Sequence, residues 1–245
     1  MQHSYYLLNW KLYRSYAATR EWCTQYGEEL AALGQRAHIV LFPEISSLAF
    51  VASHLRHPLL MGAQYCSAVP HGSYTGAISA QSLAEIGCSV CIVGHYETRQ
   101  LFHLTDETIT AITQTLLAYK ITPVICIGEQ SKTPDDQQRE RSIAQQLKPL
   151  EPILTDSPSP LHLMIAYEPV WAIGASQPPA PDYISGTGAI LKAWSLRFPH
   201  HRITLLYGGS VQESSIESLR QISFYEGFML GRASLDMQTL KKLIY

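Results

Sequence analysis

Short runs of apolar and β-branched residues recur along the chain at intervals that suit strands separated by helices. Eight such runs occur, at residues 5–8, 38–42, 59–62, 90–93, 122–127, 161–166, 203–206 and 227–230. Strands that alternate with helices imply right-handed βαβ units and a parallel sheet. With eight units in 245 residues, the pattern favours a closed (β/α)8 barrel that forms one domain over residues 1–245.

The stretches between the runs differ in helical character. Residues 105–120 give the clearest helix, because Thr105 suits the N-cap, two acidic residues follow it, and apolar residues recur on one face. Residues 182–198 give a weaker helix, since two interior glycines each cost roughly 1 kcal/mol relative to alanine. Residues 236–244 predict a short amphipathic helix that closes the chain.

Two further features bear on the architecture. A doubly wound open sheet is the alternative to the barrel, but no G-x-G-x-x-G turn follows the first strand. The Pro- and Ser-rich segment 151–160 predicts a loop rather than a domain boundary, because the strand rhythm continues after it.

Charge and cysteine content exclude several classes of function. Lys plus Arg number 18 and Asp plus Glu 20, a formal net charge of −2, whereas nucleic-acid and membrane-surface proteins carry a basic excess. No apolar run approaches the roughly 20 residues of a membrane span, and no signal-peptide cleavage site is visible. The five cysteines lack a paired metal-ligand spacing. We therefore expect no metal, no structural disulfide and a cytoplasmic protein.

Polar residues and glycines gather directly after the predicted strands. The segments there read NWK, FPE, GAQ, GHYE, CIGE, YEP, YGGS and GRA. A barrel builds its active site at this end of its strands. Each feature alone is ordinary, because a histidine after a strand is usually structural and paired glycines usually mark turns. Together, at one rim of one barrel, they predict an active site.

Three ionisable residues at this rim suit proton abstraction beside a carbonyl group. Glu168 ends an apolar strand, and desolvation there would raise its pKa and make it a stronger base. His95 precedes a stretch that can start a helix, whose positive end disfavours an imidazolium. Lys11 would supply a fixed positive charge. A base, a neutral imidazole donor and an ammonium can together stabilise an enediolate.

An anion site is also indicated. The segments YGGSV and LGRAS follow the seventh and eighth strands. Glycines let backbone N–H groups approach a phosphate closely, and barrels commonly hold phosphate at this place. Gly174, in the segment after Glu168, can add another N–H group if that segment closes.

These motifs resemble one family. NWK, GHYE, CIGE, AYEPVWAIG, YGGSV and GFMLGRASL occur in the order and spacing of triosephosphate isomerase, from Asn9 to Leu235. The resemblance implies a (β/α)8 TIM barrel and an aldose–ketose isomerase of glycolysis and gluconeogenesis. Triosephosphate isomerase is itself the standard example of a glutamate base with a neutral histidine electrophile, so these roles are inherited from the resemblance.

The resemblance assigns a role to each matching residue. Glu168 would be the base, His95 the electrophile and Lys11 the electrostatic stabiliser. Glu97 would orient the lysine region, Asn9 would contact substrate, and a cysteine would pack beneath His95. The cysteine beneath His95 is Cys126. The residues that would bind phosphate through backbone N–H groups are Gly174, Ser210, Gly231 and Arg232. The lid would consist of Pro169, Val170, Trp171, Ala172, Ile173, Gly174, Ala175 and Ser176, with hinges at 169–171 and 177–179. The lid would keep water from the enediolate.

The segment 66–79 resembles the family's loop that enters a partner subunit's site. Thr75 would then contact the neighbour's catalytic residues, which implies a two-fold homodimer. A simple surface loop is the alternative.

Several positions depart from the family around the predicted histidine. A small hydroxyl residue is replaced by Tyr96, whose phenol either crowds Glu168 or turns away. Two arginines become Thr98 and Arg99, which would weaken an ion-pair network around Glu97. The family's AQN becomes Gln64–Tyr65, a change on the interface side.

The lid and the phosphate turn depart as well. Ala175, Ser176 and Gln177 replace the usual TGK, and the two prolines that follow stiffen the far hinge. Arg232 replaces a glycine. If its backbone needs a positive φ, it costs on the order of 1 kcal/mol or more. Its guanidinium would either add charge or obstruct the site.

Three hypotheses follow. The first is an active triosephosphate isomerase that interconverts dihydroxyacetone phosphate and D-glyceraldehyde 3-phosphate without metal or organic cofactor. The alternatives are a catalytically impaired barrel that binds a phosphate ligand, and an isomerase of a four-carbon sugar phosphate. The retained Lys11, His95 and Glu168 favour the first.

Overall fold

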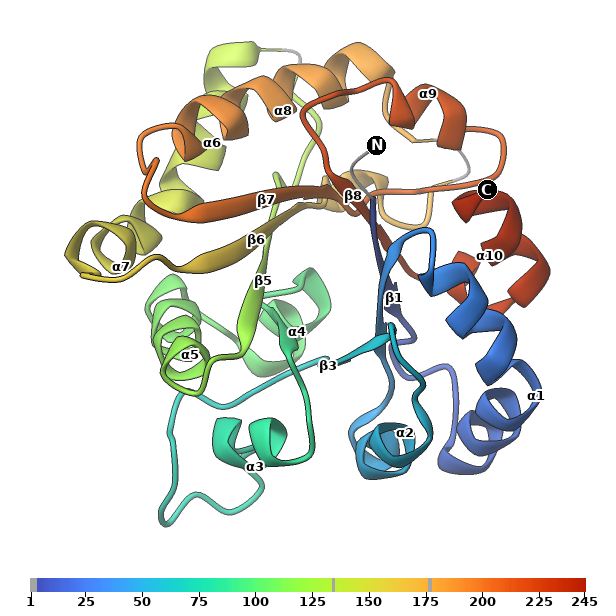
Figure 1. Cartoon of the computed structure of the whole chain (residues 1–245). Helices are drawn as coiled ribbons and strands as arrows, with labels where there is room; N and C mark the ends of the chain where they lie inside the picture. The colour runs from blue at the N-terminus through green and yellow to red at the C-terminus, as the bar shows by residue number, and fades with distance from the viewer. Residues whose placement is uncertain (1–3, 134, 176–177) are drawn as a thin grey trace.

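Eight parallel strands, hydrogen-bonded in sequence order, close into a barrel in which β8 returns to β1. The computed structural model describes residues 4–133, 135–175 and 178–245. Helices surround the barrel between successive strands (Figure 1). The (β/α)8 prediction is confirmed, and the strand positions agree within a residue or two. The strands are β1 Tyr5–Asn9, β2 His38–Phe42, β3 Leu60–Ala63, β4 Val90–Val93, β5 Thr122–Ile127, β6 His162–Tyr167, β7 Arg202–Tyr207 and β8 Gly227–Leu230.

The three predicted helices form, and Thr105 is the N-cap that the sequence predicts. Thr105 accepts the N–H of Thr108 and starts α5, and Asp236 accepts the N–H of Thr239 and starts α10. The helices are α1 Tyr16–Gly34, α2 Leu48–His54, α3 Ala80–Glu85, α4 Tyr96–Phe102, α5 Asp106–Ala118, α6 Asp136–Leu147, α7 Glu151–Asp156, α8 Pro181–Ser195, α9 Ile216–Arg220 and α10 Met237–Ile244. Short 3-10 turns are η1 Ile45–Ser47, η2 Lys148–Leu150, η3 Val170–Ala172 and η4 Arg232–Leu235.

The packing of helix α8 explains why two glycines lie within it and weaken its prediction from sequence. A Cβ on Gly188 would come within 2.8 Å of Phe224, and one on Gly186 within 2.8 Å of the Arg139 guanidinium. Both glycines therefore allow close packing of α8 against its neighbours, and this packing offsets their low helix propensity.

The prediction of a loop over 151–160 is wrong in its first half, where α7 forms. Proline at position 152 lies in the first turn of this helix, where a missing N–H costs nothing. Ile153 and Leu154 are buried against the core. Tertiary burial thus decides the helix, against the turn-forming composition of the segment.

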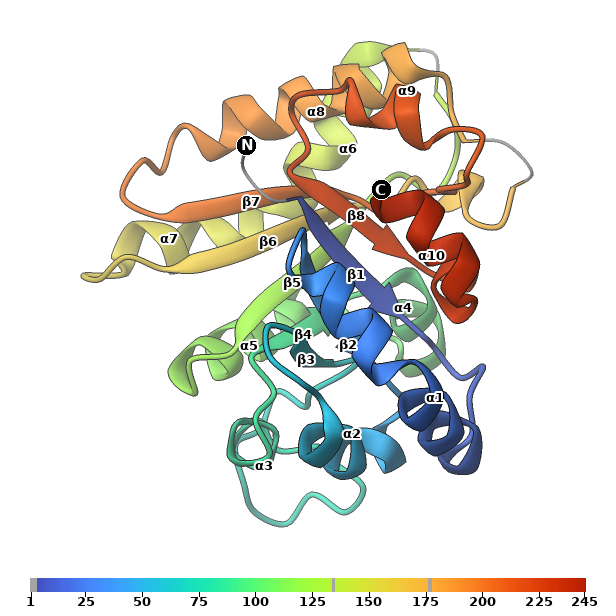
Figure 2. The same cartoon turned by 45° about the vertical axis from the view of Figure 1, so that its right-hand side comes forward.

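The core has two layers, as alternation along each strand requires. Inward-facing residues such as Leu7 and Val40 fill the barrel, whereas Leu8 and Leu41 pack outward against the helices. Figure 2 shows the helices flanking the strands. In the described part of the chain, none of the helices has the length and hydrophobicity needed to cross a bilayer.

Candidate active site

The carboxyl ends of the strands enclose a cavity of about 350 Å³. Every residue predicted to be catalytic or substrate-binding lines it, so segments far apart in sequence meet at one rim. These residues are Asn9, Lys11, His95, Glu97, Glu168, Gly174, Ser210, Gly231 and Arg232. Because the volume falls within the usual range for small-molecule sites, the cavity suits a small polar metabolite.

Glu168 follows β6 and is held in a dry position. Its backbone N–H donates to the carbonyl of Ile127 at 2.8 Å, and the residue is only 3% exposed. Carboxylate atom Oε2 has no hydrogen-bond partner among the described residues. Burial raises the pKa of Glu168, while the neighbouring His95 ring and the thiol of Cys126 oppose the rise. A buried carboxylate with a raised pKa is a competent general base.

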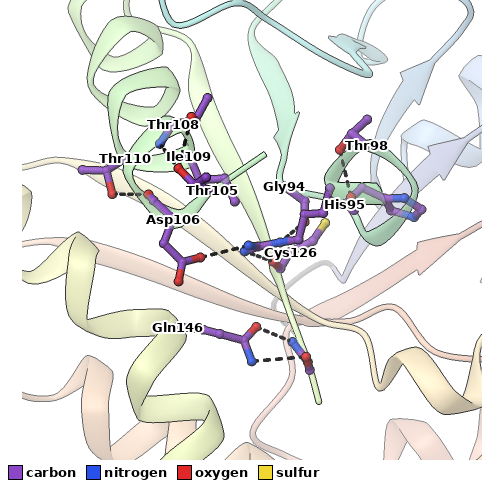
Figure 3. Close-up of polar contacts among 12 residues, drawn as sticks. Gly94, His95, Thr98, Thr105, Asp106, Thr108, Ile109, Thr110, Cys126 and Gln146 are labelled. Carbon is purple, nitrogen blue, oxygen red and sulfur yellow. Dashed lines mark hydrogen bonds and ion pairs between the residues drawn. The ribbon is translucent and has the colours of Figure 1, made fainter. Parts of the chain in front are cut away.

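Two glycines make room for Glu168 on either side of β6. A Cβ on Gly128 would lie 1.9 Å from the Glu168 carbonyl oxygen, and one on Gly208 would lie 2.7 Å from its Cγ. The side chain of Gln146 holds Gly128 in place, accepting its N–H at 3.0 Å and donating to its carbonyl at 3.2 Å (Figure 3). Gly208 is thus a functional residue that we did not predict, although it lies within the quoted YGGSV segment.

We expect Gly208→Ala to displace the Glu168 carboxylate. The new methyl group would overlap the glutamate side chain, and a misplacement of about 1 Å can cost about 10²-fold in rate. Because that side chain can yield partly, we expect kcat to fall about tenfold, with the melting temperature nearly unchanged. Steady-state kinetics with thermal melting would check this. An unchanged kcat would mean that the carboxylate has space elsewhere.

His95 caps helix α4 and points its outer nitrogen at Glu168. Its Nδ1 accepts the backbone N–H of Glu97 at 3.3 Å. An accepting nitrogen carries no proton, so the proton of a neutral ring lies on Nε2. Nε2 lies 3.5 Å from Glu168 Oε1. The local structure therefore presents the Nε2–H of this ring to the cavity, the electrophile geometry that the resemblance implies.

Lys11 is fixed by its backbone as well as its charge. Its φ of +49° lies in the left-handed region, which is uncommon for residues other than glycine. Its N–H donates to Asn9 Oδ1 at 3.1 Å, and Gln64 Nε2 donates to its carbonyl at 2.8 Å. Its Nζ donates to Glu97 Oε1 at 2.8 Å. Gln64, whose segment the sequence places on the interface side, thus also helps to position the lysine.

Glu97 is the counter-ion of this part of the site. Burial alone would raise the pKa of Glu97, but the hydrogen bond from Lys11, the neighbouring His95 and the Lys11 ammonium together hold the pKa below its usual value. Glu97 therefore stays ionised, and its hydrogen bond with the Lys11 ammonium is consistent with a role in orienting the lysine.

Tyr96 turns away from Glu168. Its hydroxyl donates to Glu97 Oε1 at 3.2 Å, and its ring lies 4.9 Å from that of His95. Burial, with the charge of Glu97, raises the pKa of Tyr96 to about 12, so the phenol remains a hydrogen-bond donor at neutral pH. The structure answers the question left open by the sequence: the larger side chain joins the Glu97–Lys11 pair.

Neither Thr98 nor Arg99 forms an ion pair with Glu97, in agreement with the weakened ion-pair network that the sequence suggests. Arg99 Nη1 instead pairs with Asp106 at the start of α5, at 2.9 Å. Thr98, in the place of the other arginine, donates its hydroxyl to the His95 carbonyl at 2.8 Å (Figure 3). Arg99 reaches α5 and the Gly94 carbonyl, to which its Nε donates at 2.8 Å, whereas Thr98 bonds within the first turn of α4.

The proposed anion site presents unpaired backbone donors. In the described parts of the chain, the backbone N–H groups of Gly174, Ser210, Gly231 and Arg232 donate to no hydrogen-bond acceptor. Arg232 begins η4, and its φ is not positive. The strain considered for Arg232 therefore does not arise. Backbone N–H groups that converge on a cavity without partners are suited to an anion.

The lid contacts the rest of the site at both ends of its described part, Pro169–Ala175. Trp171 Nε1 donates to Glu129 Oε1 at 2.9 Å, and the same oxygen accepts the hydroxyls of Tyr167 and Tyr183 at 3.0 and 2.7 Å. The hydroxyl of Ser210 donates to the carbonyls of two lid residues, Ala172 and Ala175, at 3.0 Å each. Ser176 and Gln177, predicted for the lid and its far hinge, lie outside the described residues.

Glu129 is a further residue whose role we did not predict. It ends the CIGE segment, which the sequence had marked only as a strand end. Its carboxylate accepts hydrogen bonds from three side chains beneath the lid. Its position after β5 could have marked it as a functional residue, but its three partners are visible only in the structure.

Thr75 is not brought to the cavity of its own chain. It lies in an exposed loop between β3 and α3, and it is not among the lining residues. Cys126 is buried at the end of β5, and burial together with the Glu168 carboxylate raises the pKa of its thiol. Among the residues described, no three His, Cys, Asp or Glu side chains are grouped so that they could hold a metal ion.

Burial of Glu168 has a consequence for stability. Its pKa is higher in the folded than in the unfolded chain, so the native state binds more protons above about pH 4.3, and the free energy of unfolding falls as pH rises through that window. We expect Glu168→Gln to raise the free energy of unfolding at pH 7 by roughly 1–3 kcal/mol and to have little effect at pH 4. Urea unfolding at both pH values would check this, and an equal effect at both would contradict it.

Comparison with known proteins agrees with this site. A family model described as triosephosphate isomerase matches residues 5–245. A protein of that name from Trichormus variabilis is 31% identical over 237 residues, with 96% of this chain and 95% of the relative covered. Those from Thermus thermophilus and Gluconacetobacter diazotrophicus are 33% and 32% identical, with the same coverage. The chain thus belongs to the triosephosphate isomerase family.

Proposed function

We propose that the chain interconverts dihydroxyacetone phosphate and D-glyceraldehyde 3-phosphate. The observation that carries this proposal is the meeting of Lys11, His95 and Glu168 in one cavity with a set of unpaired backbone N–H groups. No observation favours an impaired barrel or a four-carbon substrate, since Tyr96 turns to Glu97 and Arg232 is unstrained.

The reaction begins with proton transfer to Glu168. Its carboxylate takes a proton from the carbon next to the carbonyl, and the released electron pair moves onto the carbonyl oxygen to form an enediolate. His95 donates a hydrogen bond from Nε2 and Lys11 adds its positive charge, so both stabilise the developing oxyanion. The proton of the neighbouring hydroxyl group passes through His95 Nε2 to the former carbonyl oxygen, and Glu168 returns its own proton to the former carbonyl carbon. The oxygen that has lost its proton becomes the new carbonyl oxygen, which completes the isomerisation.

The phosphate and the lid make this chemistry selective. The N–H groups of Gly174, Ser210, Gly231 and Arg232 hold the phosphate, as their unpaired state supports. The lid excludes water while the enediolate exists, since an exposed enediolate would eliminate its phosphate. The bonds from Ser210 to the lid carbonyls stabilise the covered arrangement.

A coupled assay with purified protein and D-glyceraldehyde 3-phosphate tests the proposal. We expect saturable formation of dihydroxyacetone phosphate in wild-type protein and none above background in Glu168→Gln prepared identically. Folded wild-type protein without turnover would refute the proposed activity. Faster turnover of a four-carbon sugar phosphate would transfer the activity to that substrate.

We also propose a homodimer. The loop that carries Thr75 is exposed throughout residues 70–77, and it protrudes from the barrel between β3 and α3 (Figure 1). Tyr74 is exposed on this loop, Leu12 and Tyr13 are exposed after β1, and Leu101 and Phe102 are exposed at the end of α4. Such surfaces are typical of interfaces. Sedimentation equilibrium should give twice the mass of the chain, and a monomer at micromolar concentration would contradict the proposal.

A cytoplasmic location without metal or organic cofactor fits this function. All five cysteines are free, as suits a reducing compartment. The groups that the mechanism uses all belong to the chain itself. Activity that survives dialysis against a chelator would support the absence of a metal.

A further inference from the structure

The guanidinium group of Arg232 has no hydrogen-bond or ion-pair partner among the described residues. Its side chain is exposed and lines the cavity. Lys11, the other cationic Lys or Arg side chain in the lining, is paired with Glu97 at 2.8 Å. Arg232 has neither an ion pair nor a hydrogen bond with the described residues. An unpaired cation beside unpaired backbone donors is a place for an anion.

The guanidinium lies against the lid. A Cβ built on Gly174 would be 4.0 Å from Arg232 Nη2, and Gly174 has a φ of +77° that favours glycine. The hydroxyl of Ser210 bonds the lid carbonyls of Ala172 and Ala175 on the same side of the mouth. The lid and the arginine side chain therefore face each other across the donors that begin η4.

We propose that the Arg232 side chain is a ligand of the substrate phosphate, additional to the backbone donors, and that it closes over the phosphate with the lid residue Gly174. This inference deepens the proposed function and rests on it. A guanidinium can give two parallel N–H···O bonds to a phosphate, whereas a backbone N–H group gives one. Arg232 is thus a specificity-determining residue, which selects a dianionic group over a neutral one.

The alternative, that the guanidinium obstructs the site, fits the geometry less well. The cavity of about 350 Å³ remains with Arg232 in place. Its side chain is exposed at the rim, whereas the reacting groups His95 and Glu168 are 4% and 3% exposed. Phosphate held near the rim and carbonyl held near the buried pair would leave the guanidinium on the phosphate side.

The test uses Arg232→Ala, Arg232→Lys and the surface control Arg56→Ala in the full chain. Calorimetric titration with inorganic phosphate should show a Kd about 10- to 100-fold higher for Arg232→Ala, as expected for a lost hydrogen bond to a charged group. The Kd of Arg232→Lys should lie between those of wild type and Arg232→Ala, because an ammonium keeps the positive charge but cannot form two parallel hydrogen bonds. Arg56 pairs with Glu28 on the exposed surface, so its variant should match wild type.

Kinetics provide a second readout that a merely structural role would not move. With D-glyceraldehyde 3-phosphate, KM should rise in Arg232→Ala, whereas kcat/KM for unphosphorylated D-glyceraldehyde should stay within about twofold if only the phosphate contact is lost. An unchanged or lower Kd for phosphate in Arg232→Ala would overturn the inference, as would a wild-type protein that binds no phosphate.

The two proposals can fail separately. If wild-type protein is an active isomerase and its Kd for phosphate is the same in Arg232→Ala, the isomerase function stands and the role of Arg232 as a phosphate ligand is refuted. A wild-type protein without isomerase activity, whose phosphate affinity still falls in Arg232→Ala, refutes the function and supports the ligand. Circular dichroism of each variant confirms folding, and Arg232→Gln serves as a second neutral variant.

Discussion

Replacing Glu168 with aspartate should lower kcat by about 10²-fold or more while leaving the fold intact. Loss of one methylene draws the carboxylate back by about 1.5 Å, and a misplacement of about 1 Å already costs about 10²-fold. The Glu168 carboxylate is buried with one unpartnered oxygen, so few contacts are lost. Steady-state turnover of D-glyceraldehyde 3-phosphate measures the effect.

Glu168→Gln sharpens this experiment. It preserves length but cannot accept a proton, so we expect a loss of up to about 10⁴-fold, the range of general-base catalysis. The Kd for inorganic phosphate should be unchanged in both variants, because phosphate contacts other residues. If aspartate supports nearly normal turnover, the base has been assigned to the wrong residue.

His95→Asn should lower kcat by about 10²- to 10³-fold, the usual cost of removing one donor to a developing oxyanion. Asparagine is a favourable N-cap, so it can replace the bond that His95 Nδ1 makes to the N–H of Glu97. Its amide is too short to occupy the position of Nε2, 3.5 Å from Glu168. Helix α4 should therefore persist while the electrophile is lost, with kcat falling more than KM changes.

A matched control lies at the other end of the same helix. His103 ends α4 with a φ of +50°, a conformation that asparagine also tolerates. His103→Asn should leave kcat and the melting temperature close to wild type. Equal losses in the two variants would indicate that damage to α4, and not removal of a donor, explains the His95 result.

The fold followed closely from local pattern. Strand positions, the cap at Thr105 and the final helix were predicted because each depends on neighbouring residues. The segment 151–160 was mispredicted since its helix α7 depends on burial of Ile153 and Leu154 by distant parts of the chain. Where turn-forming composition and tertiary burial conflict, burial decides.

The sequence predicted which residues form the candidate site, but it did not predict the contacts among them. Lys11, His95 and Glu168 follow strands, and the carboxyl ends of parallel barrel strands meet at one rim. Which group pairs with which depends on side-chain direction, so the roles of Gln64 and Glu129 and the pairing of Arg99 with Asp106 were not predicted.

By itself, the sequence determined the eightfold alternation, the rim and the residues that reach it, because hydrophobic period and strand ends are properties of adjacent positions. Only the tertiary structure decided that Tyr96 turns to Glu97, that glycines flank Glu168, and that Arg232 faces the lid. These contacts join residues brought together when the barrel closes, and steric fit across that closure is absent from any local stretch of the chain.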